Sequence, residues 1–205
     1  MQYDQVYKQL TLALVMPERI TVRDRFPWWK IVAQGKLGFA FAAWSVLHVA
    51  GRTYASPRVA ARYAASTGAY LLADTCMNYR LGTLTKLVVL HHAVMGYFPW
   101  AIVALDISPT MWYLMMCAGS TELGVALFYV FLRAPHSKAA RTMARLGLLQ
   151  RTLAVAECAR TLILGHAAQD AAKHPITVAL MVLILAINQY YTYLFYRKYA
   201  RMTSG

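Results

Sequence analysis

The sequence predicts an all-α protein, a multi-pass transmembrane helix bundle of about six spans with an interfacial N-terminal arm. The chain has 205 residues, of which 59% are hydrophobic and only 14% are charged, and its mean hydropathy is +0.40. A soluble domain has about 25% charged residues, so this chain has too little polar side-chain surface to coat a water-soluble globule. The 13% of aromatic residues argue against an intrinsically disordered chain.

The first segment, residues 1–35, is expected to be a basic and aromatic arm at the membrane interface. Its apolar run at 10–16 is too short to cross a bilayer, and no small-residue cleavage site follows it, which argues against a secretory signal. Phe26, Trp28 and Trp29 are side chains typical of the headgroup region. We therefore expect this arm to lie along the membrane surface.

Six apolar segments follow the arm, several of them near the lower length limit for a membrane-spanning helix. They cover about residues 37–55, 64–79, 84–105, 110–132, 147–167 and 176–196. The fifth is interrupted by Arg151, Glu157 and Arg160, whereas the sixth is the most uniformly apolar. We expect one bundle domain over residues 36–197 and a short basic tail at 198–205.

The basic residues are distributed unevenly between the two sides of such a bundle. The net charge is +13, and with six spans 15 of the 21 Lys and Arg residues fall on the side that holds both termini. Because Lys and Arg accumulate in cytoplasmic loops, both termini are expected on the cytosolic side, or on the matrix side of the mitochondrial inner membrane. The endoplasmic reticulum is the other candidate location. The positive charge is assigned to orientation and anionic lipid, with no nucleic acid partner.

Ionisable and polar side chains inside the spans are the candidate functional residues, because such groups are costly in lipid. Thr67, Asp74 and Asn78 lie on one face of the second span. The third span contains His91 and His92, which point about 100° apart on a helix.

We expect these side chains to form a polar lipid-binding chamber. Its predicted members are His48, Asp74, His91, His92 and Glu122. Asp74 is expected to orient one histidine, and Glu122 offers a second carboxylate. If the protein is an enzyme, His91, His92 and Asp74 are the candidate catalytic group, since a carboxylate-oriented imidazole can act as a general base. Alternatively, the same groups make interhelical hydrogen bonds that stabilise the bundle.

Two further sets of charged residues lie at or near the span ends. Glu157 and Arg160 are three residues apart and are expected to pair, while Arg151 is expected to extend toward the basic side. Contacts with anionic lipid, cardiolipin in a mitochondrial membrane, are predicted for Arg133, Lys138, Arg141, Arg145, Arg197 and Lys198.

Neither a metal site nor a cofactor is predicted. No two of the three cysteines have the CxxC spacing of a thiolate metal site. The six histidines lack the HxxxH and HxxHH boxes that hold two irons in membrane hydroxylases and desaturases.

Five short motifs, in their order along the chain, resemble the TLC-domain family over residues 36–197. They are S-x-x-H at Ser45–His48, S-T-G-A-Y-L-L-A-D at Ser66–Asp74, L-H-H at Leu90–His92, S-T-E at Ser120–Glu122 and N-Q-Y-Y at Asn188–Tyr191. The family includes ceramide synthases, translocon-associated membrane proteins and small lipid-regulating TLC proteins.

The resemblance matches His91 and His92 to the histidine pair of ceramide synthases, which transfers an acyl group from acyl-CoA to a sphingoid base. The region after the pair departs from a synthase, because it holds only Asp106 and Glu122 where a synthase has a further His-Asp, another Asp and a Leu-Glu. The small TLC proteins, which shape membrane lipid composition or transport, are therefore the nearer likeness, and ceramide synthase activity is not expected.

Three functions follow from these observations. The first is a TLC-like membrane protein that binds or regulates membrane lipid. The second is a non-catalytic accessory subunit of a large mitochondrial inner-membrane complex, which would contribute to assembly and cardiolipin packing beside other membrane subunits. The third is an acyl-CoA-dependent acyltransferase with a histidine base.

Overall fold

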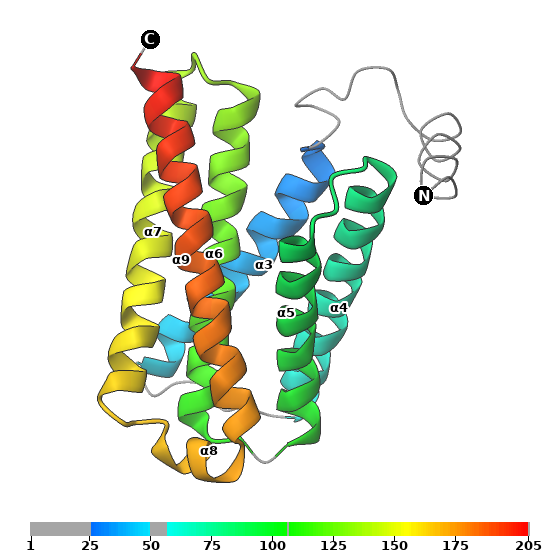
Figure 1. Cartoon of the computed structure of the whole chain (residues 1–205), viewed down its shortest axis with the longest axis vertical. Helices are drawn as coiled ribbons and strands as arrows, with labels where there is room; N and C mark the ends of the chain where they lie inside the picture. The colour runs from blue at the N-terminus through cyan, green and yellow to red at the C-terminus, as the bar shows by residue number, and fades with distance from the viewer. Residues whose placement is uncertain (1–25, 50–56, 106, 205) are drawn as a thin grey trace, which may run out of the picture.

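The computed structural model describes residues 26–49, 57–105 and 107–204, and all regular structure within them is helical (Figure 1). The prediction of an all-α fold is therefore confirmed. The described helices are α3 (Trp28–Val49), α4 (Pro57–Arg80), α5 (Lys86–Ala104), α6 (Pro109–Arg133), α7 (Lys138–Ile163), α8 (Ala168–Lys173) and α9 (Pro175–Thr203).

Each of the six expected segments overlaps one of the six long helices, but the boundaries differ at both ends of the chain. Helix α3 begins at Trp28, within the segment that was expected to be the interfacial arm, and α9 continues to Thr203 through the expected tail. Lys30 and Gln34 interrupt the apolar pattern before residue 37, and both are buried. The rest of the expected arm, residues 1–25, lies outside the described residues.

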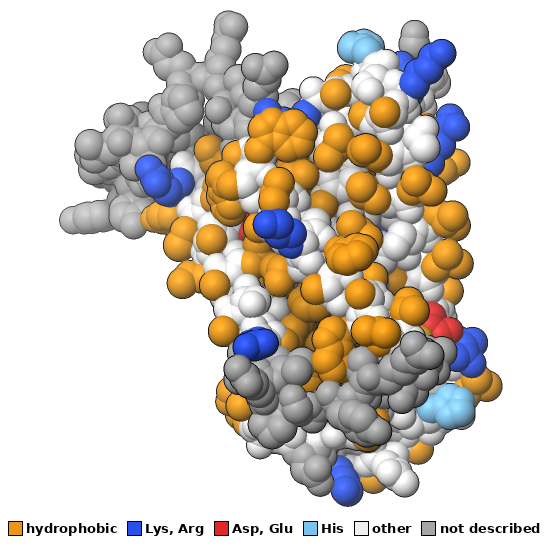
Figure 2. Space-filling view, turned by 180° about the vertical axis from the view of Figure 1, so that it is seen from behind, with side chains coloured by type: hydrophobic (Ala, Val, Ile, Leu, Met, Phe, Trp, Pro, Cys, Tyr) orange, Lys and Arg blue, Asp and Glu red, His pale blue; other side chains and the backbone are white. Residues whose placement is uncertain are grey.

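Three of the described helices, α5, α6 and α9, are long and apolar enough to cross a membrane. Apolar side chains are also exposed on the outside of the bundle, and they cover much of the face seen in Figure 2. On α7, for example, Leu146, Leu149 and Leu153 are each more than half exposed. An outer surface of this kind suits contact with lipid, and it supports a membrane-embedded protein.

Helix α6 starts at a capped and anchored position. Ser108 is its N-cap and accepts a hydrogen bond from the Met111 amide at 3.1 Å, and Pro109 occupies the first turn, where its missing N–H costs nothing. The buried carboxylate of Asp170 on α8 accepts hydrogen bonds from the Ser108 amide, at 2.9 Å, and from its hydroxyl. A carboxylate is favourable at a helix N-terminus, so this contact fixes α8 against the start of α6.

Helix α6 lies at the centre of the bundle because glycines bring α3 and α7 close to it. A Cβ atom on Gly38 of α3 would lie 2.0 Å from the Leu123 amide nitrogen, and one on Gly124 of α6 would lie 2.5 Å from the Gly147 carbonyl oxygen of α7. Helix α9 packs mainly on α7, whereas α4 and α5 form a hairpin whose helices pack mainly on each other. The fold therefore consists of a four-helix group, α3, α6, α7 and α9, with the α4–α5 hairpin beside it (Figure 1).

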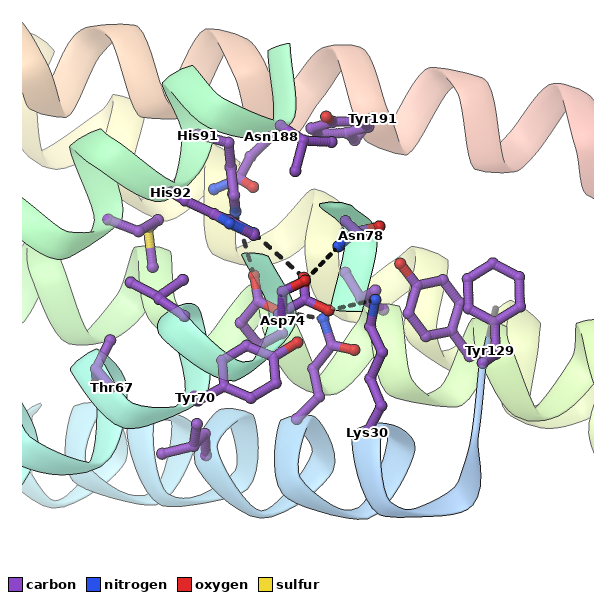
Figure 3. A pocket seen from close by; sticks show the side chains of 18 of the residues that line it. Lys30, Thr67, Tyr70, Asp74, Asn78, His91, His92, Tyr129, Asn188 and Tyr191 are labelled. Carbon is purple, nitrogen blue, oxygen red and sulfur yellow. Dashed lines mark hydrogen bonds and ion pairs between the residues drawn. The ribbon is translucent and has the colours of Figure 1, made fainter. Parts of the chain in front are cut away.

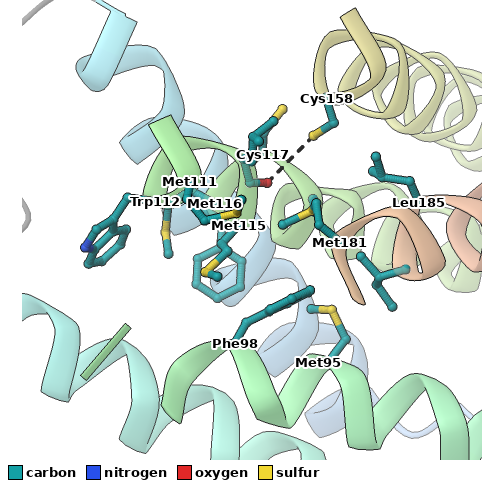
Figure 4. Close-up of a cluster of buried hydrophobic side chains, with 14 of the residues drawn as sticks. Met95, Phe98, Met111, Trp112, Met115, Met116, Cys117, Cys158, Met181 and Leu185 are labelled. Carbon is teal, nitrogen blue, oxygen red and sulfur yellow. Dashed lines mark hydrogen bonds between the residues drawn. The ribbon is translucent and has the colours of Figure 1, made fainter. Parts of the chain in front are cut away.

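The lower half of the bundle, as drawn in Figure 1, is filled by a core of methionine and aromatic side chains. Phe98, Met111, Met115 and Met181 are completely buried there (Figure 4). Two thiols bridge α6 and α7 in the same layer: Cys117 donates to the Ala154 carbonyl at 3.5 Å, and Cys158 donates to the Leu114 carbonyl at 3.7 Å. Both cysteines thus serve as small buried core residues.

Candidate functional site

A cavity of about 220 Å³ lies between the α4–α5 hairpin and the four-helix group. It is located toward the end of the bundle where α3 begins and α4 ends, since Phe26, Asn78 and Thr83 are among its lining residues. An engineered apolar cavity of about 150 Å³ holds a benzene molecule, so this cavity has room for a small organic group. Its charged and histidine lining residues are Lys30, Asp74, His91, His92, Glu122 and Arg151.

Asp74 on α4 is the centre of the first polar cluster on the cavity wall. Its Oδ1 lies 2.5 Å from Lys30 Nζ on α3, and its Oδ2 lies 3.2 Å from His92 Nε2 on α5 (Figure 3). Lys30 and Asp74 are 4% and 6% exposed, so this is a buried ion pair. The prediction that Asp74 orients a histidine is confirmed, and the histidine is His92.

His92 uses both of its ring nitrogens within the protein. Besides the contact with Asp74, its Nδ1 lies 2.7 Å from the Thr75 hydroxyl, which is also 2.7 Å from the Leu71 carbonyl oxygen. Nε2 thus faces the Asp74 carboxylate and Nδ1 faces the Thr75 hydroxyl, whose own proton is directed to the Leu71 carbonyl. His92 is therefore held in place, with no nitrogen left for another molecule.

Glu122 on α6 forms the second polar cluster. Its Oε1 is 3.7 Å from His91 Nε2, and its Oε2 accepts a hydrogen bond from Gln34 Nε2 on α3. The His91 ring also meets the Tyr191 ring edge to face, with 5.9 Å between the ring centroids. Gly38 lies one turn after Gln34 on α3, and its lack of a side chain lets α3 approach α6 closely at Glu122.

The two adjacent histidines thus serve different carboxylates, as their positions on a helix require. Their ring centroids are 5.8 Å apart and their planes are inclined by 57°. His92 turns to Asp74 on α4, whereas His91 turns to Glu122 on α6. The cavity therefore brings together four of the five residues predicted for the chamber. The fifth, His48, is in α3, but its side chain lies outside the described residues.

The position of Arg151 on α7 shows that one prediction was wrong. Arg151 does not extend to the basic side of the bundle but is 1% exposed and lines the cavity. Its guanidinium donates to the Thr121 carbonyl at 3.0 Å, to the Asn188 carbonyl at 3.1 Å and to the Thr192 hydroxyl at 2.9 Å. A buried guanidinium needs acceptors for its N–H groups. Because α6 and α9 supply three of them, Arg151 stays inside the bundle and does not extend to the headgroup region.

Besides Arg151, the polar lining residues absent from the predicted chamber include Lys30, Gln34 and Asn188. Lys30 and Gln34 were assigned to the interfacial arm, where a basic residue and an amide are unremarkable. Lys30, Gln34 and Gly38 are spaced four residues apart. This spacing puts Lys30 and Gln34 on the same helical face as Gly38, and it is the signal that could have identified them.

The basic residues predicted to contact anionic lipid lie near the end of the bundle where α6 ends and α7 begins (Figure 1). Arg133 donates to the Phe26 carbonyl at 2.7 Å, and Arg145 donates to the Tyr199 hydroxyl at 2.6 Å. Arg197 lies over the Tyr193 ring, 5.6 Å from its centroid. Lys138, Arg145, Arg197 and Lys198 are exposed, and Arg133 and Arg141 are partly buried.

Glu157 and Arg160 on α7 form the predicted ion pair, which is confirmed. The contact has two hydrogen bonds, at 2.8 and 2.7 Å, and Glu157 also accepts from the Tyr113 hydroxyl at 3.0 Å. The pair lies on the outside of the bundle, away from the cavity, since neither residue lines it.

Within the described part of the chain, no group of three or more His, Cys, Asp or Glu side chains could hold a metal ion. No protein-family model, curated protein or solved structure matches this chain. Fold and site together define a helical, membrane-embedded protein with a polar cavity between two groups of helices.

Proposed function

We propose that the chain is a TLC-like integral membrane protein that binds membrane lipid in the cavity between the α4–α5 hairpin and the four-helix group. The observation that carries this proposal is the cavity itself, in which two carboxylates, two histidines, a lysine and an arginine surround about 220 Å³. Buried ionisable groups inside a membrane bundle are costly and are kept where they serve a site. The order of short motifs shared with the TLC-domain family adds lipid as the ligand class.

All six long helices cross the membrane in this proposal. Helices α3, α4 and α7 fall short of the apolarity that α5, α6 and α9 reach, but several of their charged side chains are turned inward. Lys30 on α3, Asp74 on α4 and Arg151 on α7 are each no more than 6% exposed. These charges lower the hydropathy of the helices without facing lipid, which supports six spans with the basic loop ends on the cytosolic or matrix side.

Native mass spectrometry of the purified full chain tests lipid binding. We expect the wild-type protein, released from mild detergent, to carry a lipid-sized mass at about one copy per chain. The His91→Ala/His92→Ala variant should lose this mass, while His136→Ala, which changes an exposed histidine at a loop, should keep it. A wild-type protein with no adduct, or a double variant with an unchanged one, would contradict the proposal.

A second candidate function, as an accessory subunit of a mitochondrial inner-membrane complex, is favoured by one surface feature. The Glu157–Arg160 ion pair is exposed on α7, with side-chain exposures of 31% and 58%. Leu153 and Ile163, at 59% and 83% exposed, precede and follow it. A charged pair among apolar residues is unfavourable in contact with lipid chains, and a neighbouring membrane subunit would cover it.

Migration of the chain on a native gel separates the two candidates. Co-migration with an assembly of several hundred kilodaltons, lost in an Arg160→Leu variant, would support the accessory subunit. Migration as a small species would favour lipid binding by the chain alone.

A further inference from the structure

Apart from Asp74 Oδ1, which pairs with Lys30, four buried polar atoms on the cavity wall have no hydrogen-bond partner among the described residues. They are Gln34 Oε1, Thr67 Oγ1, His91 Nδ1 and Asn188 Nδ2. Gln34 and Asn188 are 4% and 1% exposed, so bulk water does not satisfy them. A buried polar group without a partner is destabilising, and four of them around one cavity indicate a ligand that supplies the missing partners.

The chemical role of two of these atoms is fixed by their neighbours. The side-chain amide of Gln34 must place its Nε2 toward the Glu122 carboxylate, which only accepts, and its Oε1 is therefore the unpaired acceptor. Asn188 Oδ1 faces the Arg151 guanidinium, which only donates, at 3.5 Å. Its Nδ2 is therefore the unpaired donor.

The role of His91 follows from the same reasoning. Its Nε2 faces Glu122 Oε1 at 3.7 Å, so in the neutral imidazole the proton lies on Nε2 and Nδ1 is an acceptor. The cavity therefore presents two acceptors, Gln34 Oε1 and His91 Nδ1, and one donor, Asn188 Nδ2. The Thr67 hydroxyl, which can donate or accept, is the fourth open group.

The formal charges on the wall cancel when the imidazoles are neutral. Lys30 pairs directly with Asp74 at 2.5 Å. The second cation, Arg151, directs its N–H groups to protein oxygens on α6 and α9, and Glu122 supplies the matching negative charge beside it in the cavity. Neither a cation nor a carboxylate is left over for a charged ligand.

These features discriminate between lipid headgroups. A phosphate would bring negative charge to a balanced wall and would meet the lone pairs of Gln34 Oε1 and His91 Nδ1. An ammonium group donates but cannot accept from Asn188 Nδ2. A hydroxyl group both donates and accepts, and it carries no charge.

We infer that the cavity takes an uncharged lipid headgroup that bears at least one hydroxyl, held by Gln34, His91 and Asn188. The inference rests on the proposed lipid-binding function and names the class of lipid. The cavity of about 220 Å³ has room for a glycerol-sized group, and long acyl chains stay in the surrounding bilayer.

A competition experiment on the wild-type chain tests the headgroup directly. The full chain is reconstituted in phosphatidylcholine vesicles with a photoactivatable dioleoylglycerol, and labelling is competed with unlabelled dioleoylglycerol, dioleoyl phosphatidic acid or oleylamine. The first two competitors have the same acyl chains and differ only at the headgroup. We expect dioleoylglycerol to compete at a concentration at least about tenfold lower than phosphatidic acid. The phosphate of phosphatidic acid would leave the acceptors Gln34 Oε1 and His91 Nδ1 without a donor.

The failures of the two proposals are distinguishable. Phosphatidic acid or oleylamine competing as well as dioleoylglycerol would overturn the hydroxyl assignment and leave lipid binding intact. The absence of saturable labelling, together with no lipid adduct on the purified chain, would mean that the cavity holds only water and would overturn both.

Two leucine substitutions locate the effect. Asn188→Leu removes the unpaired donor and should raise the competing concentration of dioleoylglycerol at least about fivefold. Gln150→Leu is the matched control, because Gln150 also has an unpaired buried Oε1 but does not line the cavity. Both variants are first checked for monodisperse elution. Unchanged competition in a folded Asn188→Leu variant would contradict the assignment, and the wild-type selectivity tests it independently if that variant does not fold.

Discussion

Lys30 Nζ lies 2.5 Å from Asp74 Oδ1, and this buried ion pair joins the first described helix to the α4–α5 hairpin. The hairpin is attached to the four-helix group by the apolar core around Phe98 and Met111 and, at the other end of the bundle, by polar contacts across the cavity. His91 and Glu122 form the second such contact, at 3.7 Å. The same side chains that line the cavity therefore also hold its two walls together.

Breaking this ion pair is expected to destabilise the bundle. Lys30→Met or Asp74→Asn alone should lower the free energy of unfolding by about 3 kcal/mol, because each leaves a buried group without its partner. The double variant should lose less than the sum of the two. Thermal unfolding in detergent measures all three, and additive losses would show that the two side chains do not interact.

Gly38 is expected to tolerate no larger residue. Gly38→Ala places a Cβ atom 2.0 Å from the Leu123 amide nitrogen, so α3 must move away from α6, at a cost of about 3 kcal/mol or more. Gly68→Ala is the matched control, since a Cβ atom there meets no atom within 4 Å. The yield and unfolding temperature of the two variants should differ clearly; equal values would mean that α3 does not approach α6 this closely.

Arg151 should be essential for folding, whereas Arg160 should not. Arg151→Met leaves the Thr121 and Asn188 carbonyls and the Thr192 hydroxyl without their donor, a loss of about 3–5 kcal/mol. Arg160→Met removes an exposed ion pair that solvent screens, so it should leave the unfolding temperature nearly unchanged. If Arg151→Met unfolds at the wild-type temperature, the guanidinium does not occupy this buried position.

The two histidines should differ in their effects. His92 has both nitrogens engaged within the protein, so His92→Ala is expected to lower the unfolding temperature. His91→Phe preserves an aromatic ring beside Tyr191 but removes the open nitrogen, so it should weaken lipid binding about tenfold with a smaller effect on stability. The reverse pattern in unfolding and lipid competition would exchange the roles of the two residues.

The sequence was sufficient to predict helices in the right order and one of the two carboxylate–histidine contacts. Periodicity predicts which residues share a helical face, and it placed Thr67 and Asp74 together on the wall that the cavity now shows. Adjacency alone predicted that His91 and His92 point in different directions. These are local properties of one helix.

The site residues that the sequence did not predict depend on which helices contact each other in the fold. Lys30 looked like a residue of a basic arm, and only its contact with Asp74, 44 positions away, places it inside the bundle. Arg151 near a helix end looked able to reach the headgroups, but acceptors on α6 and α9 bury it. The partner of a buried charge is a tertiary property, and hydropathy along one segment does not contain it.

The most direct test of the account is to locate the photoactivated dioleoylglycerol on the chain. Mass spectrometry of the labelled wild-type protein should find the modification on cavity-lining segments, within α5 near His91 and within α9 near Asn188. His91→Phe should reduce this labelling. Labelling that falls only on outward-facing residues, such as Leu149 and Leu153 of α7, and that is insensitive to His91→Phe, would contradict a lipid site between the hairpin and the four-helix group.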